Sequence, residues 1–264
     1  MDKIKPIKRL GQNFLRDENI LQRIADAAHL SGEDTVLEIG AGSGNLTRHL
    51  AEKAGFVYAV EKDRRLCKAA EENLKGFKNV EIICGDILKI DVGAGLKPAP
   101  TKVVGNLPYY ITTPIIFKLL EHKENISDII IMVQKEVAER IVAKPGGKDY
   151  GILTCSVQFY TEPKVLFKIS KGSFYPRPKV DSVLLEMKIL KKPAVNVKDE
   201  QKFFEIIKAA FGQRRKTLLN SLCNRLHLEK EAVEDILRKA GIEPQRRAET
   251  LDLDEFAKIS NFLL

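Results

Sequence analysis

The amino-acid sequence predicts an α/β fold, built around a mostly parallel sheet and followed by a small all-helical domain. Strand-like apolar patterns alternate with helical patterns from residue 35 to residue 143, which is typical of β-α-β units with right-handed crossovers. Beyond a polar stretch at 191–198, apolar residues recur with the helical period to the end of the chain. We therefore expect two domains, at 1–190 and 191–264.

Each element of the first domain follows from its local pattern. Asp17 is a preferred capping residue and precedes an apolar helical stripe over 20–28. Residues 150–160 are apolar nearly all round; we favour a helix there, and a strand is the alternative. The Gly- and Pro-rich stretch at 91–100 predicts a flexible surface loop. The other strands are predicted at 35–39, 56–60, 80–84, 102–105, 128–133, 164–169 and 181–190, and the other helices at 45–54, 63–74, 113–121 and 135–143.

Composition limits the classes of function. The chain has 264 residues, 44% of them hydrophobic, which is enough for one large domain and a small one with a buried core. The net charge of +8 indicates a polyanionic partner, because Lys and Arg clusters gain affinity by releasing phosphate counterions. The longest apolar run, at 129–133, is too short to span a bilayer, and we find no secretory signal. We therefore expect a cytoplasmic protein with no membrane partner.

The four cysteines are interpreted as the reduced thiols of a cytosolic protein. They are widely spaced, with no Cys-x-x-Cys pair and no spacing typical of zinc ligands, so no metal site is expected. These residues are Cys67, Cys84, Cys155 and Cys223.

A glycine-rich turn joins the first predicted strand of the sheet to its helix. The strand at 35–39 is followed by Gly40-Ala41-Gly42-Ser43-Gly44, and glycines at such a turn let the backbone approach a ligand closely. The spacing is GxGxG and not the GxGxxG of dinucleotide-binding proteins. This favours a ligand without a pyrophosphate.

Acidic residues end the next two predicted strands. Glu61 follows the turn by about 20 residues, the separation at which an acid typically accepts hydrogen bonds from the ribose hydroxyls. Asp86, after the third strand, is a candidate acceptor for the amino group of an adenine ring. The alternative is a plain α/β domain whose strands end in acids by coincidence, but the regular order favours a nucleoside site. S-adenosylmethionine, a nucleoside with a sulfonium and no phosphate, fits that site.

The motif Asn106-Leu107-Pro108-Tyr109 stands where the strand at 102–105 ends. The Asn106 amide oxygen and the Leu107 carbonyl can accept from the N–H groups of an exocyclic amine, which favours the pyramidal nitrogen that forms during attack on an electrophile. Proline stiffens the chain, and the Tyr109 ring can stack on a base and orient it. An ordinary turn is the alternative, and the cofactor motif upstream favours the catalytic interpretation.

These motifs together resemble the KsgA/RsmA family, the small-subunit ribosomal RNA adenine N6,N6-dimethyltransferases, along nearly the full chain. The matching segments are Gly11–Leu15, Glu38–Gly44, Gly85-Asp86, Asn106–Tyr109, Phe174–Ser182 and Phe211–Lys216. The joint match is specific, whereas Gly40–Gly44 alone would indicate only some methyltransferase. The stretch at 92–100 departs from the family pattern, and this departure affects only local loop geometry.

The resemblance implies a fold, a cofactor and a substrate. The fold is a Rossmann-like class I methyltransferase sheet of seven strands with an antiparallel last strand, plus a C-terminal helical domain. The substrate is a pair of adjacent adenosines in the 3′-terminal hairpin of small-subunit (16S) rRNA, each converted to N6,N6-dimethyladenosine during ribosome biogenesis. The expected contacts to S-adenosylmethionine are Asn13, Leu15, Gly40, Glu61, Asp86 and Asn106.

The target base is expected to leave its stack and to lie between two rings, Tyr109 and Phe174. For Phe174 the alternative is a core aromatic in a Pro-rich turn, which would be preferred without the family resemblance. No general base is expected, because the attacked nitrogen becomes acidic and can release its proton to water. The four histidines accordingly stand away from the predicted strand ends and are interpreted as surface residues. They are His29, His49, His122 and His227.

The expected partner is small-subunit rRNA within the immature 30S particle, bound by a monomer. Basic residues are expected around the mouth of the cleft, and their binding to RNA should weaken steeply with salt. The candidates are Lys8, Arg9, Arg16, Arg140, Lys144, Lys148, Arg177, Lys179, Arg214, Arg215 and Lys216, with Arg246 and Arg247 on the helical domain.

Three other functions are compatible with the sequence. The first is the macrolide-resistance methylation of adenine in large-subunit rRNA, against which the 211–216 motif and the length of the helical tail argue. The second is an N6-adenine DNA or glutamine-amide methyltransferase with an Asn-Pro-Pro-Tyr motif, in which Leu107 would be Pro. The third is a non-catalytic ribosome-assembly factor, a role that can coexist with catalysis.

Overall fold

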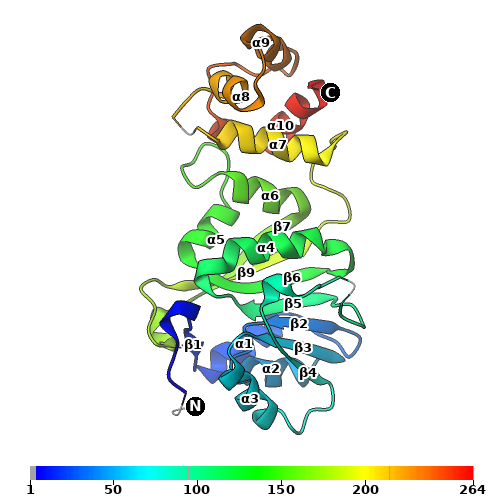
Figure 1. Ribbon diagram of the computed structural model, residues 1–264, viewed down its shortest axis with the longest axis vertical. Coiled ribbons are helices and arrows are strands. Elements are labelled where there is room, and N and C mark those ends of the chain that lie inside the picture. Colours follow the sequence, from blue (N-terminus) through cyan, green and yellow to red (C-terminus); the bar gives the residue numbers. More distant parts are fainter. Residues whose placement is uncertain (1–3, 94, 214, 264) are drawn as a thin grey trace. The chain divides into compact units, whose positions relative to one another are not determined.

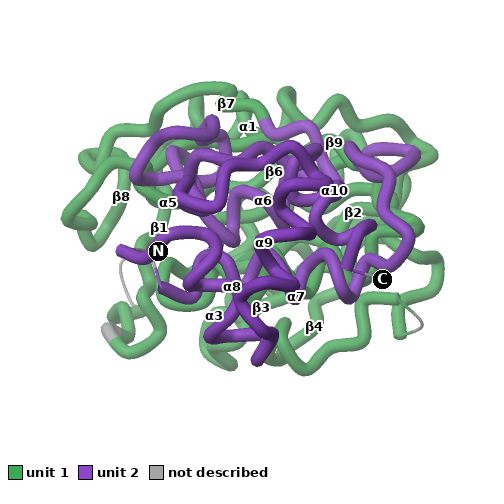
Figure 2. The backbone as a smooth tube through the Cα atoms, turned by 90° about the horizontal axis from the view of Figure 1, so that it is seen from above, with its two compact units in different colours: residues 1–138, 164–189 green, residues 139–163, 190–264 purple. Residues whose placement is uncertain are grey.

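The computed structural model describes residues 4–93, 95–213 and 215–263, which form two compact units. Unit 1 comprises Met1–Ala138 and Lys164–Ile189, and unit 2 comprises Glu139–Pro163 and Leu190–Leu264 (Figure 2). The division expected from the sequence places residues 139–163 with the sheet, whereas their contacts group them with the C-terminal helices.

Unit 1 is built on a seven-stranded sheet with the order β4-β3-β2-β5-β6-β9-β7 (Figure 1). The five strands from β4 to β6 are parallel, and β9 is antiparallel to β6, which confirms the expected mostly parallel sheet with an antiparallel last strand. The strands are β2 (Thr35–Ile39), β3 (Phe56–Glu61), β4 (Val80–Cys84), β5 (Lys102–Asn106), β6 (Asp128–Gln134), β7 (Thr161–Ile169) and β9 (Ser182–Ile189).

The register brings the carboxyl ends of four parallel strands to one edge of this sheet. Ile39 lies opposite Val60 of β3 and opposite Gly105 of β5. Glu61 lies opposite Cys84 of β4. Strands β3 and β5 flank β2, one on each side, so the order of the strands reverses direction at β2. This edge is therefore a topological switch point, where open α/β sheets bind ligands.

Two of the helices in this part of the chain, α1 and α3, begin at an Asp side chain that caps them. Asp17 caps α1, as expected, by accepting from the N–H groups of Asn19 and Ile20. Leu21 and Ile24 of that helix are buried in the core of the unit. The helices are α1 (Glu18–Ala27), α2 (Asn45–Ala51), α3 (Arg64–Asn73), α4 (Thr112–Glu121) and α5 (Lys135–Ile141), with 3-10 turns η1 (Lys8–Leu10), η2 (Ile87–Lys89), η3 (Tyr109–Ile111), η4 (Lys123–Asn125) and η5 (Lys171–Ser173).

A two-stranded sheet escapes the sequence analysis. Strand β1 (Phe14–Leu15) pairs antiparallel with β8 (Phe174–Tyr175), so that Phe14 faces Tyr175 and Leu15 faces Phe174. Two residues are too short to show the alternation by which a strand is recognised. This pair ties the N-terminal segment to the loop before β9.

Three expectations need correction in unit 1. The 91–100 stretch is a loop with exposed residues such as Asp91 and Lys97, as expected, but its Val92 and Leu96 side chains are buried. His49 is buried and its Nε2 lies 2.8 Å from Oε1 of Glu18, because its face of α2 packs on α1.

The third expectation concerns the cysteines. Cys67 and Cys84 form a disulfide with their Cα atoms 5.9 Å apart, because α3 packs on β4, whereas Cys155 and Cys223 are free. The linear spacing of cysteines does not report such a tertiary contact.

Unit 2 consists of α6 (Ile152–Tyr160), α7 (Glu200–Phe211), α8 (Leu218–Leu226), α9 (Lys230–Lys239), η6 (Ala248–Thr250) and α10 (Leu253–Phe262). The helix favoured for 150–160 is confirmed by α6. Fully buried Phe159, Phe203 and Phe256 lie in its core, and the rings of Phe159 and Phe203 are 4.8 Å apart. In the described ranges, no helix is long and apolar enough to cross a membrane.

Candidate active site

A pocket opens at the carboxyl edge of the sheet, wholly within unit 1. Most of the expected site residues line it, namely Asn13, Gly40, Glu61, Asp86, Asn106, Leu107, Pro108 and Tyr109. Further lining comes from Gly11, Gln12, Phe14, Lys62, Ile87 and Tyr110. The structure therefore brings together segments separated by about a hundred residues of chain.

The glycine turn fixes the floor of this pocket. Gly40 has φ +81°, and a Cβ at this position would lie 2.7 Å from the carbonyl oxygen of Asn106. Its N–H donates to the carbonyl of Val60 at 2.9 Å. Only glycine combines this backbone conformation with so close an approach of the two strand ends.

Glu61, at the end of β3, holds the glycine turn through its carboxylate. Its Oε2 accepts from the N–H of Gly42 at 2.9 Å, and its Oε1 accepts from the N–H of Asp63 at 2.8 Å. Burial raises the pKa of Glu61, and the backbone N–H groups oppose that shift. Each carboxylate oxygen has more than one acceptor position, so a ligand hydroxyl can also donate to this group.

Asp86, which follows β4, also lines the pocket. Its Oδ2 accepts from Nζ of Lys62 at 2.7 Å, and its Oδ1 accepts from the N–H of Leu88 at 3.1 Å. The hydrogen bond from Lys62 holds the pKa of Asp86 below its usual range. Asp86 is therefore an ionised acceptor beside the buried side chain of Ile87.

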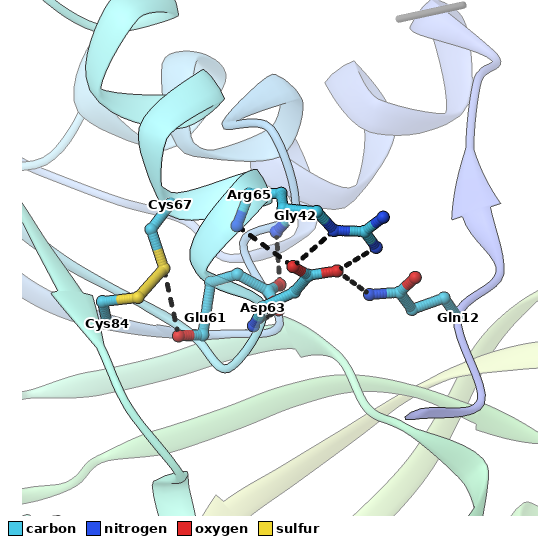
Figure 3. Close-up of a disulfide and its surroundings, with 7 residues drawn as sticks. All are labelled: Gln12, Gly42, Glu61, Asp63, Arg65, Cys67 and Cys84. Atoms are coloured by element: carbon cyan, nitrogen blue, oxygen red, sulfur yellow. Dashed lines mark hydrogen bonds and ion pairs between the residues drawn. A yellow bond between two sulfur atoms is a disulfide. The ribbon is translucent and has the colours of Figure 1, made fainter. Parts of the chain in front are cut away.

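The N-terminal segment is anchored to the pocket by two residues whose role the sequence analysis missed. Gln12 donates from Nε2 to Oδ2 of Asp63 at 3.0 Å (Figure 3). Its Oε1 accepts from the N–H of Ile7 at 2.6 Å. Asp63 also caps α3 and pairs with Arg65, which lowers the pKa of Asp63 to about 2. The sequence did contain a signal for Asp63: an Asp two residues after Glu61, at the start of a predicted helix, is a preferred capping residue.

The amide of Asn106 has a defined orientation. Its Nδ2 donates to the main-chain carbonyl of Asn13 at 3.0 Å, which directs the other amide atom, Oδ1, to act as an acceptor. Leu107 is 1% exposed, and its N–H donates to the carbonyl of Met132 at 3.3 Å. These contacts hold the Asn106–Pro108 backbone at the pocket wall.

Tyr109 is held by its hydroxyl group. That group lies 2.7 Å from Oγ of Ser182, a hydrogen bond that fixes the ring. Burial raises the pKa of Tyr109, so the phenol stays neutral at physiological pH. The adjacent Tyr110 is half exposed and faces Gly11, where a Cβ would lie 3.2 Å from its ring.

Two expected site residues do not line this pocket. Phe174 and Leu15 are cross-strand neighbours, 5% and 7% exposed, and both belong to the hydrophobic core of unit 1. Leu15 instead lines a small adjacent cavity with Glu38 and Asn106. Contact of the Phe174 ring with a base therefore remains a prediction that requires the ring to become exposed.

Glu38 is a buried carboxyl that the sequence analysis did not single out. It is 1% exposed, and its Oε2 has no hydrogen-bond partner in the described part of the chain. Burial raises the pKa of Glu38 to about 8, with a smaller contribution from the charge of Glu61. Glu38 is thus protonated at neutral pH.

The expected RNA-binding residues are mostly exposed. Arg16 places its guanidinium 4.2 Å from the centre of the Tyr175 ring, and Arg246 instead forms an ion pair with Glu255. Arg214 and the side chain of Lys8 lie outside the described residues. The exposed candidates are Arg9, Arg16, Arg177 and Lys179 in unit 1, and Arg140, Lys144, Lys148, Arg215, Lys216 and Arg247 in unit 2.

No cluster of metal-ligating side chains occurs within the residues described.

Comparison with known proteins identifies the family of this chain. The family model described as ribosomal RNA adenine dimethylase matches residues 3–263. The chain belongs to the ribosomal RNA adenine dimethylase family. A relative in that family, the ribosomal RNA small subunit methyltransferase A of Moorella thermoacetica, is 51% identical over 98% of this chain and 92% of its own length. The protein of the same description from Geobacillus thermodenitrificans is 48% identical over 97% of this chain and 90% of its own length.

Solved structures confirm the class I methyltransferase fold of the family. A dimethyladenosine transferase from Plasmodium falciparum superimposes with a TM-score of 0.79 at 28% identity, covering 93% of this chain and 95% of that one. The 23S rRNA methyltransferase ErmE superimposes with a TM-score of 0.73 at 29% identity, covering 95% of this chain and 99% of that one.

Proposed function

We propose that this chain transfers methyl groups from S-adenosylmethionine to N6 of two adjacent adenosines in the 3′-terminal hairpin of small-subunit rRNA. The observation that carries the proposal is the hydrogen bond from Asn106 to the Asn13 carbonyl, because it fixes the side-chain amide of a residue that lines the same pocket as Glu61 and Asp86 and assigns Oδ1 the role of acceptor. The relatives named ribosomal RNA small subunit methyltransferase A support the choice of substrate.

The residues of the pocket fit S-adenosylmethionine. Gly40 allows the backbone to take the close turn at the pocket, Glu61 offers lone pairs to ribose hydroxyls, and Asp86 offers an acceptor to an adenine amino group. When bound, this cofactor supplies an electrophilic methyl group on a sulfonium. Asn13 and Asn106 complete the proposed cofactor contacts, and Leu15 contributes from the adjacent cavity.

The Asn106–Tyr109 motif orients the nucleophile. Oδ1 of Asn106 and the carbonyl of Leu107 accept from the amine of the target adenine and favour the pyramidal nitrogen that attacks. The Tyr109 ring, locked by Ser182, stacks on the base and holds it in line, with stacking worth roughly 1–3 kcal/mol. Pro108 keeps the wall rigid with φ −60°.

Proton removal requires no side-chain base in this proposal. The attacked nitrogen becomes a strong acid, and its proton passes to water. For the second methylation, the monomethylated base rebinds with its remaining N–H toward Asn106. The same acceptor therefore serves both steps.

The proposed partner is RNA of the immature small subunit, recognised by a monomer in the cytoplasm, where the relatives' ribosomal substrate is assembled. Exposed Arg16 and Tyr175 lie beside the pocket wall formed by Phe14 and offer a cation and a ring to flanking nucleotides. Proposed contacts on unit 2 include Lys144 and Lys148. Such contacts weaken as salt concentration rises.

Methylation of large-subunit adenine is the second candidate, because ErmE shares the fold over nearly the whole chain. Incubation with labelled methyl donor and under-methylated small or large subunits, followed by mapping of the modified nucleotide, separates the two. Label in N6,N6-dimethyladenosine of the small subunit supports the proposal. Label confined to the large subunit, or none in either, contradicts it.

A further inference from the structure

The disulfide between Cys67 and Cys84 lies directly behind the adenosine side of the pocket. Cys84 is the last residue of β4 and lies opposite Glu61 in the register, two residues before Asp86. Cys67 lies in the first turns of α3, where its N–H donates to the carbonyl of Asp63 at 3.0 Å. The bond therefore links α3, which begins three residues after Glu61, to the end of β4, two residues before Asp86. Figure 3 shows the disulfide beside the main chain of Glu61.

Strand β4 has little else to hold it. It is an edge strand that pairs with β3 alone among the strands that the structure describes, and none of its five residues is buried. The turn from β4 to Asp86 depends on the N–H of Gly85, which donates to the carbonyl of Glu61 at 2.9 Å. Elements with few buried contacts open at low free-energy cost. A covalent link to α3 removes much of that freedom.

We propose that Cys67 and Cys84 form a reversible thiol–disulfide site that fixes the adenosine half of the cofactor pocket, so that reduction lowers the affinity for the adenosine moiety. The inference rests on the proposed function, because it assigns Glu61 and Asp86 to cofactor binding. It corrects the expectation that both cysteines are simple reduced thiols.

Solvent exposure decides which sulfur of the disulfide a small dithiol or a glutathione-type reductant attacks. Cys84 is exposed and Cys67 is 2% exposed, so the reductant thiolate attacks Sγ of Cys84. The bond between the two cysteines breaks, and Cys67 leaves as a thiolate that takes a proton from water. A second reductant thiolate displaces Cys84 from the mixed disulfide. Two electrons pass to the protein, and the reductant ends as its own disulfide.

The reduced and disulfide-bonded states differ in the hydrogen bonds that the carbonyl oxygen of Glu61 can accept. Sγ of Cys67 lies 3.4 Å from the carbonyl oxygen of Glu61. As a disulfide it carries no hydrogen, whereas the thiol can donate to this oxygen, which already accepts from Gly85. Reduction thus removes the tether and adds a donor at the hydrogen bond on which the Asp86 turn depends.

The test compares the full-length protein after treatment with oxidised glutathione and after reduction with dithiothreitol. Peptide mapping without reductant should recover the linked Cys67 and Cys84 peptides only from the oxidised sample. S-adenosylhomocysteine should bind the reduced protein at least about fivefold more weakly by calorimetry. Amides of residues 80–86 should exchange faster with deuterium after reduction, a readout that needs no ligand.

Two variants control the comparison. Cys84→Ser, at an exposed position, should behave as the reduced protein under both treatments. The double variant Cys155→Ser/Cys223→Ser should keep the full response, because those free thiols lie in the other unit.

Two outcomes would overturn the inference. Failure to recover linked peptides overturns it, as do measurable affinities that agree within twofold in the two states. Absence of any S-adenosylhomocysteine binding in either state overturns the proposed function and this inference together.

Discussion

The side-chain amide of Asn106 donates to the main-chain carbonyl of Asn13, 93 residues earlier in the chain, at 3.0 Å. Asn13 lies in the short segment that Gln12 fastens to Asp63. The orientation of the proposed catalytic amide therefore depends on a segment outside the main sheet. This relationship makes the N-terminal residues part of the site rather than a flanking tail.

Gln12→Ala should loosen that segment without unfolding the protein. Asp63 loses one donor but keeps Arg65, so the free energy of unfolding should change by no more than about 1 kcal/mol. The dissociation constant for S-adenosylhomocysteine should rise at least about fivefold, measured by calorimetry. Gln22→Ala, which removes an exposed bond to Asp26, is the matched control and should leave the constant unchanged. Equal affinities in the two variants would refute the role of Gln12.

Gly40→Ala should abolish cofactor binding. The added Cβ would stand 2.7 Å from the Asn106 carbonyl in a left-handed backbone conformation, which costs about 1–3 kcal/mol and displaces the pocket floor. Gly32→Ala adds a Cβ with nothing within 4 Å and should be close to neutral. Thermal unfolding and S-adenosylhomocysteine titration of both variants measure the difference. A Gly40→Ala protein that binds like the Gly32→Ala protein would contradict the assigned geometry.

Glu38→Gln should change how stability depends on pH. The folded state raises the pKa of Glu38 from 4.5 to about 8, so the neutral carboxyl is favoured in the fold. Its contribution to stability is complete below pH 4.5 and is lost as the pH rises through 8. Urea unfolding at pH 5, 6.5 and 8 should show a decline in wild type that is smaller in the variant. Glu121→Gln, at an exposed position, should keep the wild-type decline, and parallel profiles for all three proteins would contradict the burial argument.

Arg246 should matter for the stability of unit 2. Its guanidinium pairs with Glu255, the residue that completes the capping box of α10, and donates to the carbonyl of Thr250 at 2.6 Å. Arg246→Ala should lower the free energy of unfolding by about 1–3 kcal/mol, because these partly buried acceptors lose their donor. Arg247→Ala, at an exposed neighbour, should cost less than about 0.5 kcal/mol by urea denaturation. Equal losses would show that the ion pair contributes nothing.

The local sequence pattern was sufficient to predict the sheet and most of the residues that line the pocket. Strands at 35–39 and 80–84 were predicted with the bounds that the structure shows, because short apolar runs between turn signals define parallel strands well. The acids and glycines at the strand ends follow from the same logic, since parallel strands end at one edge. The pocket accordingly contains Gly40, Glu61 and Asp86.

Features that depend on contacts between distant segments were not predictable. The disulfide needs α3 to pack on β4, and the β1–β8 pair joins Leu15 to Phe174 across most of unit 1. Burial of Phe174 follows from that pairing, which no local pattern encodes. The orientation of Asn106 likewise depends on a carbonyl far away in sequence.

The central claim, that the Asn106 amide oxygen activates the target amine, is tested most directly by single-turnover methylation with Asn106→Ala. Under-methylated small subunits serve as substrate, and Asn125→Ala, an exposed asparagine on η4, is the matched control. We predict a rate about 10²–10³-fold lower for Asn106→Ala, with RNA affinity within twofold of wild type and full activity in the control. Methylation by Asn106→Ala at the wild-type rate would contradict the account.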